Sequence, residues 1–176
     1  GGTIQIVDPT LSSNSNTVCF AYNGASGVYV NFGENHTVKL GNGTSTLSGG
    51  HANGFLTNFK AGTGYISFGN FVIDVLNGTN RHVINAGSTV CVTKNLTIAS
   101  GEYRQYCDTY INGDFTNDGA YWMQAGNLVF ANFVSGAQTP STIAQTISGN
   151  GLFKNSAGDH NFNSVGFNNI SAGGIT

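Results

Sequence analysis

The feature that most constrains this chain lies between Val83 and Phe133, where a few alternating apolar residues precede a Gly or Asn turn, again and again. Residues 96–98, Leu-Thr-Ile, lead to Ser-Gly at 100–101, while residues 115–116, Phe-Thr, precede Asn-Asp-Gly. Such segments are too short for independent hairpins and contain almost no helix-forming residues. They predict a parallel β-solenoid, in which each short strand stacks on the equivalent strand one coil later.

The alternative fold that this pattern allows is a Greek-key β-sandwich. Dense Gly and Asn turns, and the absence of long alternating strands, favour the solenoid. Strand patterns continue outside the repeat, for example at Thr3–Val7 and at the most apolar run, Phe71–Leu76. Nothing predicts a helix or a domain boundary, so we expect one β-rich domain over residues 1–176. Both ends look cut, which predicts a processed product or a fragment of a longer protein.

The composition excludes several classes of partner. Only 8% of the residues are charged and the net charge is −2, against a typical charged fraction of about 25%. Nucleic acid is therefore not an expected partner, and no apolar run is long enough for a membrane span. Two prolines and 11% aromatic residues argue against disorder.

The polar residues are mostly Asn, Ser, Thr and Gly. Asn and Gly accept the backbone conformations of tight turns, and stacked Asn side chains can form hydrogen-bond ladders along a solenoid. The chain has few Lys residues, so its surface has less charge than is usual for a cytosolic protein. These features predict an extracellular protein.

The three cysteines show no metal-binding spacing. Cys91 and Cys107 are separated by 16 positions, which suits one short coil, and equivalent positions of adjacent strands are close enough for a disulfide. Such a bond would stabilise the fold by about 3 kcal/mol. The alternative is two buried thiols that pack as small apolar residues. For Cys19 we expect a buried free thiol.

Acidic residues gather between Glu102 and Asp118, with Arg104 among them. Enzymes of the β-helix class that act on acidic polysaccharides use carboxylates and Arg on one face, as Ca²⁺ ligands or as acid and base. Asp114 and Asp118 lie four residues apart across a turn and could share a Ca²⁺ ion, the only cofactor that the sequence suggests. The alternative is that these Asp side chains cap backbone amides. With no nucleophile or phosphate-loop motif present, we assign no catalytic residue and expect a non-enzyme.

A candidate glycan-binding group comes from alternation within one expected strand. Arg104, Tyr106, Asp108 and Tyr110 share a parity, so they face outward if Cys107 faces the core. Outward aromatic rings beside charged groups suit sugars, whose apolar faces stack on rings while their hydroxyls reach polar neighbours. The alternative is that these Tyr side chains simply cover a sheet face.

The chain also contains acceptor sequences for N-glycosylation, Asn-x-Ser/Thr, some of which arise by chance in so Asn-rich a chain. They are centred on Asn35, Asn42, Asn77, Asn95 and Asn169.

Several strings in the second half resemble the repeats of giant secreted adhesins of Bacteroidetes-type bacteria. They are INAGSTV at residues 84–90, followed by NLTI at 95–98; NGDFTNDG at 112–119; and ISGNGLF at 147–153, followed by FNNI at 167–170. The resemblance covers roughly residues 83–176. It implies export, a parallel β-helix and a role in adhesion or as a stalk, and it supplies no catalytic residues.

Three functional hypotheses follow. The leading one is a non-enzymatic, exported structural and adhesive module of a surface adhesin or stalk, with extracellular glycans or other copies of itself as partners. The second is a self-assembling filament subunit whose strand at Thr3–Val7 completes a neighbour's sheet. The third is a polysaccharide-active enzyme built on the acidic cluster, or a glycan-binding module built on the outward tyrosine group.

Overall fold

The computed structural model describes residues 1–7, 17–22, 29–44, 55–59, 65–76, 82–86, 90–134, 136–155, 158–159 and 162–176. Within these ranges the chain is all-β and contains no helix, which confirms the predicted class. Its short strands form two sheets that are mainly parallel and a small antiparallel hairpin.

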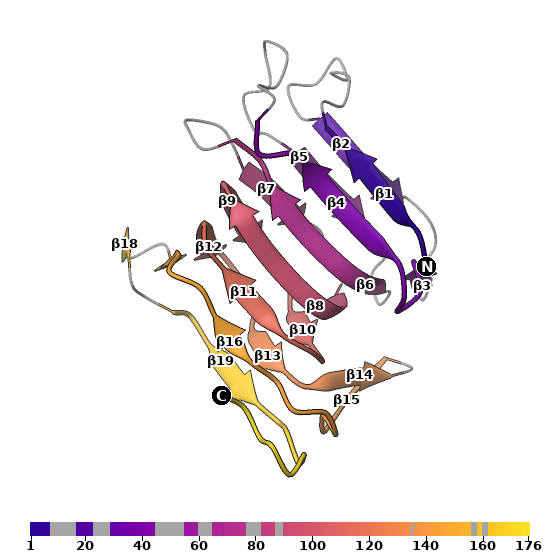
Figure 1. Ribbon diagram of the computed structural model, residues 1–176, viewed down its shortest axis with the longest axis vertical. Coiled ribbons are helices and arrows are strands. Elements are labelled where there is room, and N and C mark those ends of the chain that lie inside the picture. Colours follow the sequence, from indigo (N-terminus) through magenta and orange to yellow (C-terminus); the bar gives the residue numbers. More distant parts are fainter. Residues whose placement is uncertain are drawn as a thin grey trace.

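The larger sheet contains ten strands, which are labelled in Figure 1. They are β1 (Thr3–Ile6), β3 (Tyr29–Asn31), β4 (Thr37–Gly41), β6 (Tyr65–Asp74), β8 (Val90–Ser100), β10 (Thr109–Ile111), β11 (Phe115–Asn117), β13 (Leu128–Phe130), β16 (Ile147–Ser148) and β19 (Val165–Phe167).

The second sheet contains seven strands. They are β2 (Thr17–Tyr22), β5 (Phe55–Phe59), β7 (His82–Ala86), β9 (Glu102–Gln105), β12 (Ala120–Met123), β17 (Leu152–Asn155) and β18 (Gly158–Asp159). The hairpin pairs β14 (Asn132–Val134) with β15 (Ala137–Thr139). In the two sheets, β17–β18 is the antiparallel pair and the other described pairs are parallel.

The pairings place the strands in three rows, which the chain enters in a constant order. The first row is β1–β4–β6–β8–β11–β16. The second is β2–β5–β7–β9–β12–β17, and the third is β3–β6–β8–β10–β13–β19. Strands β6 and β8 each serve two rows: Tyr65–Ser67 of β6 pairs with β3, and Asn70–Asp74 pairs with β4. A Greek-key sandwich is built from antiparallel sheets, so that alternative does not fit the described pairings.

The interval between paired residues varies along the chain. Cys91 pairs with Thr109, an interval of 18 residues, whereas Phe115 pairs with Ile147, an interval of 32. The longer interval contains the β14–β15 hairpin. This variation explains why a short repeat is visible in the sequence over only part of the chain.

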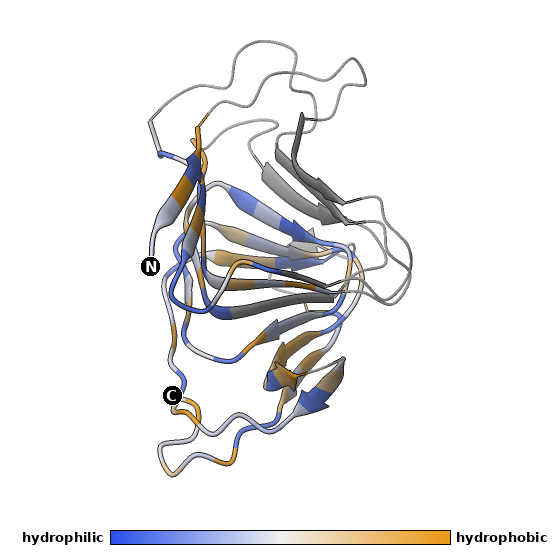
Figure 2. Ribbon diagram, turned by 90° about the vertical axis from the view of Figure 1, so that its right-hand side faces the viewer, coloured by the Kyte–Doolittle hydropathy of each residue, from blue (hydrophilic) through white to orange (hydrophobic). Residues whose placement is uncertain are grey.

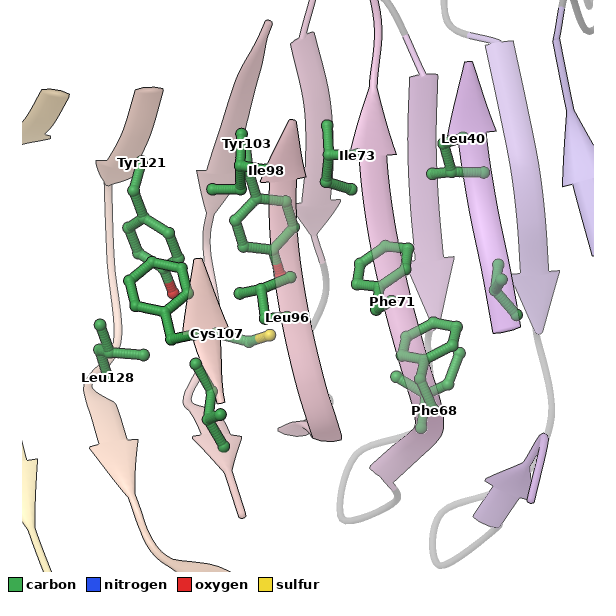
Figure 3. Close-up of a cluster of buried hydrophobic side chains, with 14 of the residues drawn as sticks. Leu40, Phe68, Phe71, Ile73, Leu96, Ile98, Tyr103, Cys107, Tyr121 and Leu128 are labelled. Atoms are coloured by element: carbon green, nitrogen blue, oxygen red, sulfur yellow. The ribbon is translucent and has the colours of Figure 1, made fainter. Parts of the chain in front are cut away.

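Inward-facing side chains follow the register from strand to strand. Leu40 pairs with Ile73 and Ile73 with Ile98, and all three are fully buried in the core (Figure 3). The rings of Tyr103 and Tyr121, on adjacent strands of the second sheet, lie 5.3 Å apart. Alternate residues of strands such as β6 and β9 face outward, and apolar and polar colours alternate along several strands in Figure 2. The core is thus built by repeating one apolar position across successive strands.

This arrangement predicts a large penalty for truncating one inward position. Leu96 is buried between its strand partners Phe71 and Phe115. Leu96→Ala should lower the free energy of unfolding by about 2–5 kcal/mol because it removes apolar contacts and leaves a cavity. Chemical denaturation measures the change. The control Thr97→Ala alters the neighbouring outward residue and should change stability by about 0.5 kcal/mol or less; equal effects for both variants would contradict the assigned faces.

Candidate functional site

One bend of the first row carries a ladder of polar side chains. Asn95 Nδ2 donates to Asn70 Oδ1 at 2.8 Å, and Asn70 Nδ2 donates to Thr37 Oγ1 at 3.4 Å. The ladder continues because Asp114 N donates to Asn95 Oδ1 and Thr146 N donates to Asp114 Oδ1, both at 2.9 Å. Side-chain amides thus bridge adjacent strands where the backbone turns, which confirms the predicted Asn ladder for Asn70 and Asn95.

The two aspartates proposed as Ca²⁺ ligands make backbone contacts. Asp114 Oδ1 accepts the N–H of Thr146, and Asp118 Oδ1 accepts the N–H of Asn150 at 3.2 Å. This is the capping role given as the alternative. Across the described ranges, no three His, Cys, Asp or Glu side chains form a group that could hold a metal ion. A Ca²⁺ ion at Asp114 and Asp118 stays a prediction.

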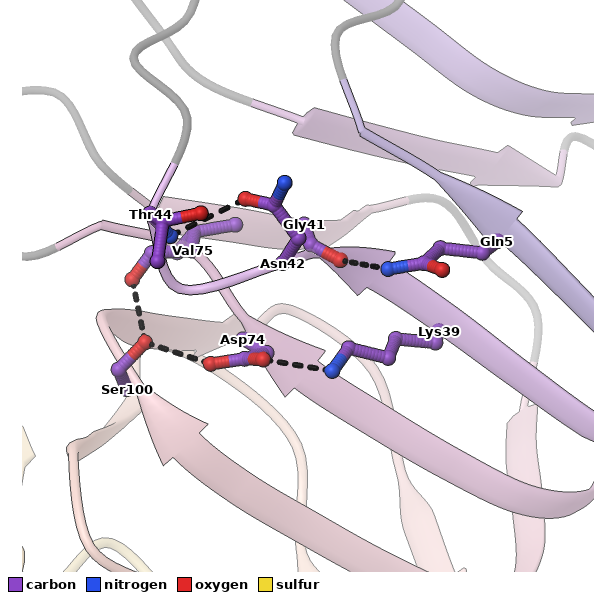
Figure 4. Close-up of polar contacts among 8 residues, drawn as sticks. All are labelled: Gln5, Lys39, Gly41, Asn42, Thr44, Asp74, Val75 and Ser100. Carbon is purple, nitrogen blue, oxygen red and sulfur yellow. Dashed lines mark hydrogen bonds and ion pairs between the residues drawn. The ribbon is translucent and has the colours of Figure 1, made fainter.

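A second polar group, which sequence reasoning missed, connects β1, β4, β6 and β8 of the larger sheet; its residues are drawn in Figure 4. Lys39 Nζ lies 2.6 Å from Asp74 Oδ2, and Ser100 Oγ donates to Asp74 Oδ1 at 3.0 Å. On β1, the neighbour of β4 on its other side, Gln5 Nε2 donates to the carbonyl of Gly41 at 3.0 Å. Gly41 has φ +87°, and a Cβ there would collide with the Asp74 carbonyl. The close approach of two strands therefore requires glycine at this position.

The predicted glycan-binding group is divided between the two sheets. Strand β9 ends before Tyr106 and β10 begins after Asp108, so Arg104 belongs to the second sheet and Tyr110 to the larger one. Asp108 Oδ1 accepts hydrogen bonds from both the N–H and Nδ2 of Asn127. The assumption of one continuous strand is wrong here because the backbone turns between β9 and β10. Tyr106 is 39% exposed at this turn.

Arg104 takes part in a stack of cations on Trp122. The Arg104 guanidinium lies 4.5 Å from the Trp122 ring centroid, and Lys154 Nζ lies 6.0 Å from it. These three residues are register neighbours on β9, β12 and β17. Glu102 forms ion pairs with both cations. Glu102 and the Trp122 ring therefore compensate the positive charges of Arg104 and Lys154 on the outer face of β9, β12 and β17.

Tyr110 contributes to a different cluster, formed with the β14–β15 hairpin. Its ring centroid lies 4.6 Å from that of Phe133, and Tyr65 meets Phe133 edge-on at 5.3 Å. Burial, and then the nearby Asp108 carboxylate, raise the pKa of the Tyr110 hydroxyl above its ordinary value. The hairpin is thus packed through Phe133 onto the outer face of the third row.

Beside this cluster lies a groove of about 290 Å³. It is lined by Glu34, Ser67, Phe68, Lys94, Asn112, Asn132, Phe133 and Ile143. Some of these residues are as many as 109 positions apart in the sequence. They meet in one groove because the strands pair in register.

A second cavity, of about 400 Å³, is almost entirely apolar and lies where β13, β17 and β19 meet. Phe167 and Phe162 line it and are 61% and 49% exposed. Phe115, Phe130 and Phe153 line it from inward positions of their strands. Here apolar residues of the core reach the surface.

The register departs from the one assumed for the predicted disulfide. Cys91 lies opposite Thr109, two residues beyond Cys107, because the local interval is 18 residues rather than 16. Cys107 is buried in the core. The side chains of Cys19 and Cys91 lie outside the described part of the structure, so the bond and the state of Cys19 stay predictions.

The glycosylation sequons occupy contrasting environments. Asn35 is exposed. Asn42 Oδ1 accepts the N–H of Thr44 in a local turn. By contrast, the Nδ2 atoms of Asn95 and Asn169 donate hydrogen bonds within the fold, which a glycan on that nitrogen would disturb. Asn77 lies outside the described residues.

Comparison of the chain with protein-family models, with curated proteins and with solved structures yields no match. The resemblance to surface adhesins therefore stays a prediction. In the described ranges, no helix has the length and apolar character needed to cross a membrane.

The two roles considered for Asp114 predict different responses. If its carboxylate caps the Thr146 amide, Asp114→Ala should destabilise the fold by about 1 kcal/mol, whereas Asp114→Asn retains an acceptor and should cost less. Thermal unfolding with Ca²⁺ or with chelator measures both effects. A rise in the Tm of the unaltered chain with Ca²⁺, abolished by Asp114→Asn, would instead establish a metal site.

Proposed function

We propose that this chain is a β-solenoid segment of an exported surface adhesin or stalk and that its work is mechanical and adhesive rather than catalytic. The observation that carries the proposal is the constant order in which the chain enters three rows of parallel strands. In a solenoid each strand extends a row, so that backbone hydrogen bonds run along the length of the molecule. A solenoid of this kind serves as a stiff spacer and presents side chains at regular intervals.

The polar contacts support this interpretation. Asn, Asp and Ser side chains connect successive strands at the bends, including the Asn70–Asn95 pair and the Ser100–Asp74 pair. These contacts stabilise the corners with amides and hydroxyls, which suits a chain with so few charged residues. The adhesin-like strings lie close in sequence to the residues that form these contacts: INAGSTV spans residues 84–90, and NGDFTNDG spans residues 112–119.

An enzyme built on the acidic cluster receives less support. Asp114, Asp118 and Asp108 each accept hydrogen bonds from neighbouring segments, and Arg104 is paired with Glu102. Their positions are explained by structural contacts. A catalytic pair of carboxylates, in contrast, needs both groups to face one bound substrate.

The proposal predicts surface display and attachment. Antibodies against residues 1–176 should label intact cells that produce the protein, and beads coated with the folded chain should attach to surfaces that those cells colonise. Beads carrying a Leu96→Asp variant control for loss of fold, because a buried charge at this core position should unfold the chain. Labelling that requires permeabilised cells would contradict the proposal, as would turnover of a glycan that Asp114→Asn abolishes.

A second candidate function, a self-assembling filament subunit, is favoured by one specific observation. Strand β1 pairs with β4 on one side, and Ile4, the register partner of the core residue Val38, is 44% exposed. The apolar cavity around Phe167 offers inward-facing side chains of a kind that could pack against such a strand. Two such surfaces on one molecule generate a head-to-tail contact, which forms filaments when it does not close.

The filament candidate predicts association that depends on two distant apolar residues. The unaltered chain should form concentration-dependent oligomers, and Ile4→Asp or Phe167→Asp should each abolish them. Size-exclusion chromatography with light scattering, followed by electron microscopy, provides the measurement. The matched control is Ile170→Asp, since Ile170 is 69% exposed and does not line the apolar cavity. A monomer at all concentrations would exclude this candidate.

A further inference from the structure

We propose that the groove beside the β14–β15 hairpin binds a neutral saccharide of one or two rings. The groove differs from the group predicted from sequence, because Arg104, Tyr106 and Asp108 do not line it. Its volume of about 290 Å³ lies at the lower end of the range for small-ligand sites, about 300–1,000 Å³. The inference rests on the proposed adhesive function and gives it a ligand class.

The apolar wall of the groove is held in place by ring contacts. Phe133 lines the groove and is fixed by Tyr110, at 4.6 Å between centroids, and by Tyr65, at 5.3 Å. Ile143, which is 39% exposed, adds a second apolar contact. Rings positioned in this way provide a surface for the apolar face of a sugar without ordering a flexible side chain on binding.

The polar lining supplies donors and acceptors for sugar hydroxyls. Asn132 Oδ1 accepts the N–H of Phe133 at 2.9 Å, which orients the amide of Asn132 at the groove. Asn112 Oδ1 is buried and has no hydrogen-bond partner among the described residues. Because this oxygen has almost no accessible surface, Asn112 contributes to the groove through the rest of its side-chain amide, whose nitrogen is a hydrogen-bond donor. Ser67 adds a hydroxyl to the same lining.

The charges of the groove favour a neutral ligand. Glu34 and Lys94 both line it, and within the described residues neither forms an ion pair. Their charges cancel, so the groove lacks the surplus of cations that an acidic sugar requires. An entirely apolar ligand would desolvate both charged groups without replacing their hydrogen bonds. A neutral molecule with several hydroxyl groups can form hydrogen bonds with the Glu34 carboxylate, the Lys94 ammonium group and the Asn side-chain amides at the same time.

Binding of the folded chain to an array of neutral and acidic saccharides, followed by calorimetry with the best neutral saccharide on the array, tests the inference. Asn112→Ala and Lys94→Ala should each weaken binding about tenfold through loss of hydrogen bonds, with thermal melts confirming that both variants fold. The matched controls Arg104→Ala and Tyr106→Ala change residues outside the groove and should bind like the unaltered chain.

Three results would overturn the inference: no saccharide bound, selective binding of acidic saccharides, or loss of binding in Arg104→Ala with Asn112→Ala unaffected. The test is separable from that of the adhesive function. If the chain is displayed on cells but binds no saccharide, only the saccharide site in the groove is refuted. If it binds saccharide but is not displayed, the adhesive function is refuted.

Discussion

The structure depends on the in-register pairing of parallel strands along three rows. Side chains alternate between the two faces of a strand, so a shift of one residue would move a whole set of apolar side chains from the core to solvent. The buried series Leu40, Ile73 and Ile98 exists only because three strands share one register. Each pairing therefore specifies a stretch of backbone hydrogen bonds and a part of the core at the same time.

Polar side chains at the bends help to hold this register while the intervals between strands vary. Asn70 and Asn95 bridge adjacent strands across an interval of 25 residues, and Asp114 accepts the N–H of Thr146 across an interval of 32. These bonds depend on which residues lie opposite one another in the register and not on the length of the connection between the strands. The chain can consequently insert a hairpin such as β14–β15 without disturbing the rows, and the proposed saccharide groove lies beside that insertion.

Local chemistry was sufficient to predict the strand class, the absence of helices in the described residues and the Asn ladder, and it gave amide capping as one of two roles for Asp114 and Asp118. Each of these depends on a residue and its near neighbours: short apolar alternation, a turn residue, or an amide beside a bend. The prediction was wrong where it assumed that one strand continues from Arg104 to Tyr110. Arg104 and Tyr110 share a parity in the sequence, yet the turn between β9 and β10 places them on different sheets.

The sequence by itself therefore determined the kind of structure, because alternation and turn propensity act over a few residues. Tertiary structure alone decided which distant residues meet: Cys91 lies opposite Thr109, and Glu34, Lys94, Asn112 and Phe133 share a groove. The physical reason is that intervals between paired residues range from 18 to 32 around Cys91 and Phe115. Register across such unequal intervals is chosen by burial of the core as a whole, which no local pattern encodes.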